Sequence, residues 1–406
     1  MEDDAFRMAK RKKKSGGGAF GSGRKAGPSA PAPKPQTVMS VRDSERMTKI
    51  IHKIVAAKEF GSIEEMQAFV GDHLVGLELE ELEAMLPDDA LESDFERAES
   101  LIAGIPEGTS ADEVIRIARQ ALALSEYCMG AWFEYGVYAD DTATALERFE
   151  KGIERGRARF EEQIKESGEG HGLWGYVEAR DFMRLLEERA KALVELGRME
   201  EAAEVYEEML ALSPNDNQGI RCDLLRILLI HRRLEDARKL LDRFPNDALA
   251  DMAYGRALLE IVETADRTGF EIPDANSPKA PASPAAFRKA LGPEFQVAIG
   301  LLNHAVKVNP FVPLFMTHGS ILDVEVDELA CFGGPYEAVT YAQQWCLLWY
   351  ASGLPFLLLS GVPLENVKKL AKSPHITGEL LDVSDQLEDF DALEGQPWWE
   401  KFDERM

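Results

Sequence analysis

Residues 210–229, LALSPNDNQGIRCDLLRILL, end one helical pattern and start another. Apolar residues at helical spacing run up to Leu212, and Pro214 stops the pattern because proline lacks an amide hydrogen and clashes with the preceding turn. Asn and Asp side chains then cap helix ends, and glycine supplies backbone freedom. We interpret this stretch as a joint between two helical hairpins. Its motif consists of Asn215, Asn217, Gln218, Gly219 and Arg221.

The hairpins on the two sides of this joint repeat the same pattern. The first places a small residue, Ala202, in its second helix, where two helices approach closely, with the large Tyr206 four positions later. A shift of 35 residues carries Ala202 onto Ala237 and Tyr206 onto Leu241. A period of about 34 residues with two helices in each period is the signature of tetratricopeptide repeats. The sequence resembles that superfamily.

Two further units extend the pattern. Residues 132–152 match the same template with a shorter loop, with Gly136 in the first helix and Gly152 in the second. A third full hairpin begins near Tyr254. Its second helix, which contains Ala298, follows only after a Pro- and Ala-rich insertion at about 264–293. We expect this insertion to be a surface excursion.

These patterns predict an all-α fold, a right-handed superhelical stack of tetratricopeptide-like helical hairpins with extra N-terminal helices. Ser62 with Glu65, and Ser110 with Glu113, have the spacing of capping boxes that begin two helices. The expected domains are a disordered basic tail rich in Gly, Ser, Pro and Ala at 1–38, an N-terminal helical region at 40–108, the repeat array at 109–363, and an acidic C-terminal tail at 364–406 that could form a capping helix.

Within the superfamily, four segments are similar to a narrower group of tetratricopeptide proteins. They are GHGLWGYVEARDFMRLLEERAKAL at 170–193, LSPNDNQGIR at 212–221, VNPFVPLFM at 308–316 and GGPYEAVTYAQQW at 333–345. This resemblance covers roughly residues 110–350 and suggests, more distantly, the suppressor-of-tumorigenicity-seven family. The sequence departs from the group at the end of this region, where LWYASGLPFLLL replaces a more polar helix. The resemblance implies the fold more strongly than it implies a biochemical role.

The charge of the chain is unevenly distributed. Residues 1–50 contain 12 Lys/Arg and 5 Asp/Glu, although the whole chain has a net charge of −26. The acidic body repels nucleic acids and anionic membranes, because binding either requires clustered cations. The basic cluster Lys10–Lys14 could be a nuclear-import signal or could simply keep the tail soluble. A plastid transit peptide is disfavoured by the acidic residues at 2–4. We expect a cytoplasmic or nuclear protein that binds no nucleic acid.

The apolar run at 345–362 has two interpretations. It contains 18 residues without a charge, which is the lower limit for a membrane span. Gly353 and Pro355 lie in its middle, where a proline breaks a helix. We therefore predict a buried helix, a tight turn and a second short helix, with anchoring to a membrane as the alternative.

No group of residues for catalysis, for a metal or for a cofactor stands out in the sequence. The seven histidines do not occur at the spacing of a zinc site, and no serine lies in a GxSxG elbow. The four cysteines form no CxxC pair, so we expect reduced thiols. We expect a protein without catalytic activity, metal or cofactor. The alternative is an enzyme with an unrecognised site between the array and the N-terminal helices.

The first helices of stacked hairpins line a concave groove, and such grooves bind partner proteins. The candidate groove residues are Arg184, Glu187, Lys191 and Arg226. Cations in so acidic a chain suggest a groove for an acidic or carboxylate-ended peptide. The alternative is that these cations pair with neighbouring acids at helical spacing. We interpret the protein as a non-catalytic scaffold or adaptor for protein partners.

Overall fold

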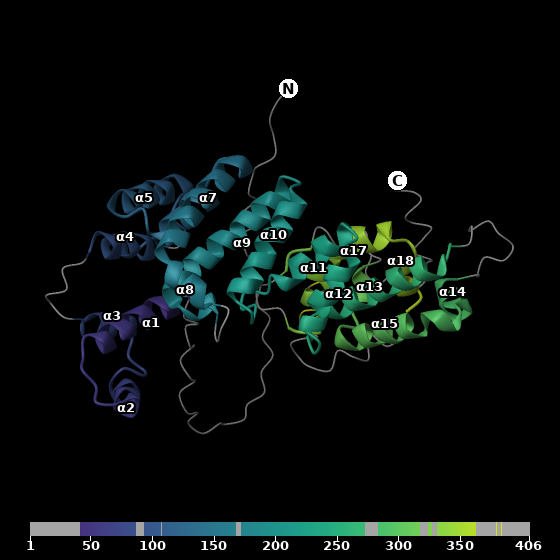
Figure 1. Cartoon of the computed structure of the whole chain (residues 1–406), viewed down its shortest axis with the longest axis horizontal. Helices are drawn as coiled ribbons and strands as arrows, with labels where there is room; N and C mark the ends of the chain where they lie inside the picture. Colours follow the sequence, from purple (N-terminus) through teal and green to yellow (C-terminus); the bar gives the residue numbers. More distant parts are fainter. Residues whose placement is uncertain are drawn as a thin grey trace, which may run out of the picture.

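The computed structural model describes residues 41–86, 93–106, 108–167, 172–272, 283–316, 324–326 and 331–362, together with Glu379 and Val383. Over these residues every regular element is a helix (Figure 1), which confirms the predicted all-α fold. The predicted basic tail at 1–38 and most of the predicted acidic tail at 364–406 lie outside the described residues.

Three N-terminal helices form a small unit with its own apolar core. They are α1 (Val41–Ala56), α2 (Ile63–His73) and α3 (Leu79–Glu83). Ile50 and Ile54 of α1 pack with Leu74 and Leu82, and every other apolar residue of this core also belongs to residues 41–86. The unit therefore does not share an apolar core with the rest of the described chain.

Two more helices precede the repeats. α4 (Asp94–Ala103) and α5 (Ala111–Leu124) pack against each other and against α6 (Met129–Val137). Of the two capping boxes predicted, neither forms in full: the Ser62 hydroxyl accepts from the amide of Glu65, but the Glu65 carboxylate accepts from the amide of Gly61 and not from that of Ser62. Ser110 precedes α5 but its side chain makes no capping bond, and the Glu113 carboxylate pairs with Arg116.

Consecutive hairpins then pack against one another (Figure 1). Their helices are α6 with α7 (Thr142–Arg159), α9 (Arg180–Glu195) with α10 (Met199–Leu212), α11 (Arg221–Ile230) with α12 (Leu234–Arg243), and α13 (Ala250–Thr268) with α15 (Gln296–Val308). The short helices α8 (Glu161–Glu166), η1 (Leu173–Gly175) and η2 (Val177–Ala179) connect the first two hairpins. This order confirms a stack of tetratricopeptide-like hairpins.

Small residues lie where the helices of the hairpins touch, as the repeat pattern predicts. Ala202, Ala237 and Ala298 are completely buried. At Gly136 of α6, an added Cβ would lie 2.1 Å from the Cε1 atom of Phe149 in α7, so only glycine fits between these helices. Close approach of backbones therefore sets the spacing of the array.

The C-terminal part continues the packing with shorter helices. They are α14 (Pro284–Ala290), η3 (Pro293–Phe295), α16 (Val312–Phe315), α17 (Pro335–Ala351) and α18 (Leu354–Ser360). The insertion expected at 264–293 begins inside α13, which runs on to Thr268. Its last part forms α14, which buries Phe287 and packs on α18, so this part belongs to the core and not to a surface excursion.

The apolar run at 345–362 folds as predicted. α17 ends at Ala351, Gly353 adopts a positive φ of 64°, and α18 starts at Leu354 with Pro355 in its first turn. A helix, a tight turn and a second short helix therefore replace a single long helix. Within the part of the chain that the structure describes, no helix has both the length and the apolar character needed to cross a membrane.

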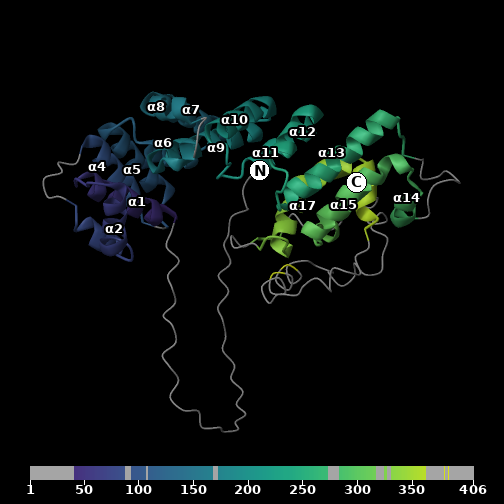
Figure 2. The ribbon, with the colours of Figure 1, turned by 60° about the horizontal axis from the view of Figure 1, so that its bottom comes forward.

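α17 packs back on α13, the first helix of the last hairpin, and both views show the two side by side (Figures 1 and 2). Trp345 and Trp349 are completely buried, and the Trp345 indole N–H donates to Asp251 of α13 over 2.7 Å. Glu379, from the region of the predicted acidic tail, accepts from the backbone amides of Cys331 and Tyr336 at the start of α17. The chain thus covers part of its own array.

Candidate functional site

The joint motif is organised by an aspartate that the sequence analysis did not single out. The carboxylate of Asp216 accepts from the backbone amides of Ile220 and Arg221 over 3.0 and 3.1 Å, at the start of α11. It also pairs with the Arg221 guanidinium over 2.8 Å. Asp216 is buried and has a positive φ of 50°, a conformation that Asp tolerates better than most residues. The joint is therefore capped by Asp216.

The predicted motif residues have different roles around this aspartate. Arg221 also binds Asp247 in the next joint over 2.5 Å, and the Gln218 amide donates to Glu187 of α9 over 2.6 Å. Gly219 adopts the positive φ that glycine favours, while Asn215 and Asn217 are exposed. The motif is thus a connection between hairpins.

Three of the predicted groove residues lie near one another on α9 and α11. The ammonium group of Lys191 pairs with Glu187 over 2.7 Å and with Glu188 over 2.9 Å. The guanidinium of Arg226 pairs with Asp223 over 2.7 Å. Desolvation raises the pKa of Asp223, although Arg226 and then Lys191 act in the opposite direction. We call Glu187, Lys191, Asp223 and Arg226 the charged strip.

The charged strip ends where α17 begins to cover the array. The second guanidinium nitrogen of Arg226 donates to Gln344 of α17 over 3.1 Å. On the same exposed face of α17, Leu347 has 79% of its surface open to solvent. The pairing of Lys191 and Arg226 with acids at helical spacing is the alternative that the sequence analysis kept open. These cations therefore reach a ligand only by sharing or exchanging their present acids.

Arg184, the fourth predicted groove residue, lies in the N-terminal half of α9 and contacts α1. Its guanidinium donates to Glu45 of α1 over 2.7 Å and to Asp181 over 2.7 Å. Arg180 donates to the same Glu45 oxygen over 3.0 Å. The structure thus places Arg184 at the contact with the N-terminal unit, about one helical turn from Glu187 of the charged strip.

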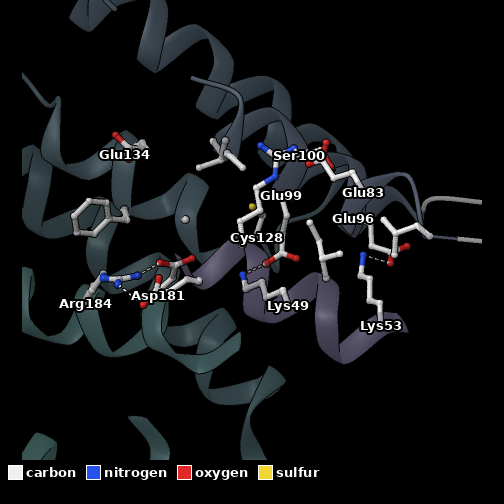
Figure 3. A pocket seen from close by; sticks show the side chains of 18 residues that line it. Lys49, Lys53, Glu83, Glu96, Glu99, Ser100, Cys128, Glu134, Asp181 and Arg184 are labelled. Carbon is white, nitrogen blue, oxygen red and sulfur yellow. Dashed lines mark hydrogen bonds and ion pairs between the residues drawn. The ribbon is translucent and has the colours of Figure 1, made fainter. Parts of the chain in front are cut away.

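A cavity of about 630 Å³ lies beside this contact, between α1, α4, α6 and α9. Figure 3 shows Arg184 and Asp181 at one side and the Lys49–Glu99 and Lys53–Glu96 pairs at the other. The apolar part of the wall includes Ile50, Ile102 and Phe133. The cavity lies between the array and the N-terminal helices, which is where the alternative enzyme site was expected.

Two groups that line the cavity, Glu96 and Cys128, have strongly shifted pKa values. The hydrogen bond from Lys53, together with those from the backbone and hydroxyl of Ser93, lowers the pKa of Glu96 to about 2. Burial raises the pKa of the Cys128 thiol to about 12. This cysteine is a protonated thiol at neutral pH and is a poor nucleophile. The cavity therefore offers charge pairs for binding and no activated nucleophile at Cys128.

The residues that complete this site come from distant parts of the sequence. Glu45 is 139 positions from Arg184, so no local spacing indicated their contact. Over the residues described, no three His, Cys, Asp or Glu side chains are grouped so as to hold a metal ion. All four cysteines are free thiols.

The comparisons with known proteins bear on the array. No curated protein and no solved structure matches the chain. A family model described as Tetratricopeptide repeat matches residues 193–261, from the end of α9 to the middle of α13. These residues contain the hairpin α11–α12, the joint before it and the joint after it. The match supports placing this helical array in the tetratricopeptide repeat superfamily.

Proposed function

We propose that the protein is a non-catalytic adaptor that holds a peptide segment of a partner protein along the charged strip. The observation that carries this proposal is the position of the strip. It lies on the first helices of two stacked hairpins, α9 and α11, between α1, which contacts Arg184, and α17, which contacts Arg226 of the strip. Tetratricopeptide-like arrays use such surfaces to bind proteins.

The chemistry of the strip favours a peptide with a carboxylate. The Lys191 side chain is 46% exposed, although it pairs with two acids. Exposed pairs of this kind contribute only about 0–1 kcal/mol, so exchange of one carboxylate for another costs little. A partner carboxylate would replace Glu187 or Glu188 at Lys191, and an apolar partner side chain would cover Leu347.

A peptide-binding experiment tests this proposal. The full-length protein is immobilised and exposed to short peptides that carry either a free C-terminal carboxylate or an amide. We expect the free carboxylate to be preferred, and the double variant Lys191→Glu with Arg226→Gln to bind at least about tenfold more weakly, which corresponds to about 1.4 kcal/mol.

Lys239→Glu is the matched control. Lys239 also pairs with acids three and four positions earlier, but it lies on α12, the second helix of its hairpin. This variant should bind like the natural protein. Equal peptide binding by the natural protein and by the double variant would show that the charged strip is not the binding site.

Several finer predictions accompany this proposal. We propose that the partner segment is acidic or carboxylate-ended, and that the protein acts in the cytoplasm or nucleus. The basic cluster Lys10–Lys14, for which an import signal and a solubilising role were both predicted, lies outside the described residues. Membership in the narrower tetratricopeptide group and the distant relation to the suppressor-of-tumorigenicity-seven family stay predictions, as does the absence of catalysis.

A further inference from the structure

The N-terminal unit α1–α3 is joined to the rest of the described chain chiefly through ion pairs. Its own core is closed, because the apolar residues that form it all belong to residues 41–86. The polar face of α1 reaches outward instead, with Glu45 bound to Arg180 and Arg184, Lys49 bound to Glu99, and Lys53 bound to Glu96. Such contacts separate at lower cost than an apolar interface.

The contact at Glu45 has the form of a carboxylate-binding site. Two arginines one helical turn apart on α9 donate to one carboxylate oxygen, over 3.0 and 2.7 Å. Both guanidinium groups also lie over the Trp174 ring, 5.4 and 5.7 Å from its centre. Paired arginines fixed by an aromatic ring are suited to carboxylates, since the guanidinium donors are preorganised. We call Arg180, Arg184 and Trp174 the arginine clamp.

We propose that Glu45 occupies the arginine clamp as an internal ligand, and that an acidic segment of a partner protein binds there after displacing it. The N-terminal unit then acts as a lid over this end of the array. This inference rests on the proposed function, because it extends the partner-binding face from the charged strip to the clamp and adds regulation by α1.

The surroundings of Glu45 support exchange over a permanent contact. The cavity of about 630 Å³ lies beside Arg184 of the clamp, which lines it together with Glu45 and Asp181, so this side of the Glu45–Arg184 contact is not packed with protein. Burial acts to raise the pKa of Glu45, but hydrogen bonds and charge from Arg184 and Arg180 outweigh it and lower this pKa. Glu45 is therefore ionised in the clamp, as an incoming carboxylate would be.

Hexaglutamate is the probe, with hexaglutamine as its neutral counterpart. In the full-length protein, Glu45→Gln should raise the affinity for hexaglutamate about tenfold or more, because the internal competitor loses its charge. Adding Arg184→Gln to Glu45→Gln should remove the gain. Hexaglutamine should bind none of these proteins measurably.

Glu83→Gln is the matched control. Glu83 also lines the cavity, but it pairs with Arg46 inside the N-terminal unit and does not touch the clamp. Its affinity for hexaglutamate should equal that of the natural protein. An equal gain from Glu83→Gln, or no gain from Glu45→Gln, would overturn the proposal.

A measurement on the natural protein guards against a variant that folds poorly. Saturating hexaglutamate should increase amide hydrogen exchange in α1 and leave α13 unchanged. Unchanged exchange in α1 with hexaglutamate bound would contradict the displacement. Failure of the charged strip to bind peptides leaves this test intact, since the clamp is read through Glu45 and Arg184 and the strip through Lys191 and Arg226.

Discussion

The side chain of Asp216 makes both the helix cap and the ion pair that hold the joint between α10 and α11. It caps the first turn of α11 with two backbone bonds and holds the Arg221 guanidinium. Asp216 cannot be distinguished from Asn215 and Asn217 in the sequence, because all three residues of the turn are equal candidates for capping. Only the fold shows which one faces inward.

Replacement of Asp216 by Ala should lower the free energy of unfolding by about 2–5 kcal/mol. The loss combines a helix cap, about 0.5–2 kcal/mol, with charge-assisted hydrogen bonds of about 1.5–3 kcal/mol. Urea unfolding followed by circular dichroism measures it. Asn215→Ala, an exposed neighbour in the same turn, should change stability by less than about 0.5 kcal/mol. Similar losses for both variants would show that Asp216 is not the cap.

Asp251 gives a prediction about pH. Desolvation, with repulsion from Glu337 and Asp223, raises its pKa from the ordinary 3.8 to about 6, against the hydrogen bond from Trp345. The folded protein thus keeps a proton that the unfolded chain releases near pH 3.8. The stability from this proton is fully present below about pH 3.8 and is lost as the pH rises through about 6. Asp251→Asn, which stays neutral, should lack this loss. Unfolding curves between pH 4 and 7 test it, and parallel curves for both proteins would contradict the shift.

The helices could be predicted from sequence because the signals that form them are local. Apolar spacing, Pro214 and the small residue Ala202 all act within a few turns of chain. The docking of α17 could not be predicted in this way. Trp345 meets Asp251 across 94 positions, and the apolar pattern of α17 indicates burial without specifying the surface that buries it. The last part of the insertion predicted at 264–293 was wrong for the same reason, because this part forms α14 and α14 depends on its contact with α18.

At the scale of this element, Trp345→Ala should weaken the docking of α17 on α13. The indole is completely buried and fills the space beside Gly255. Removal of a buried aromatic ring costs about 3–5 kcal/mol. Leu347→Ala on the same helix removes an exposed side chain and should cost less than about 0.5 kcal/mol. Denaturant unfolding of the two variants distinguishes the loss of the docking contact from a change in helix propensity. Equal losses in the free energy of unfolding would contradict the docking contact.

The whole molecule has separate cores that should differ in stability. The core of α1–α3 is small, whereas the main core runs from α6 to Val383. Amide hydrogen exchange should therefore show the weakest protection in α1–α3 and the strongest in α13. At about 1 M NaCl, where the Debye length is about 3 Å, exchange in α1–α3 should increase further while α13 stays unchanged. Uniform protection across both regions would argue for one cooperative unit.

The candidate site was predictable in part at this scale. Lys191, Glu187 and Arg226 do come together, because repeat periodicity places equivalent positions of successive first helices side by side. Arg184 occupies the same kind of position in the sequence, but Glu45 of α1 forms an ion pair with it. Contacts that join the ends of an array to the rest of the chain follow no repeat, so periodicity cannot reveal them.

Arg221 has a consequence for how such an array could change over evolution or in design. Its side chain holds Asp216 in one joint and Asp247 in the next. Each hairpin therefore depends on ion pairs with residues outside it. Deletion or duplication of α11–α12 would leave an arginine or an aspartate without its ion-pair partner at each new junction. Recombination of such hairpins therefore succeeds only where both charged partners are kept.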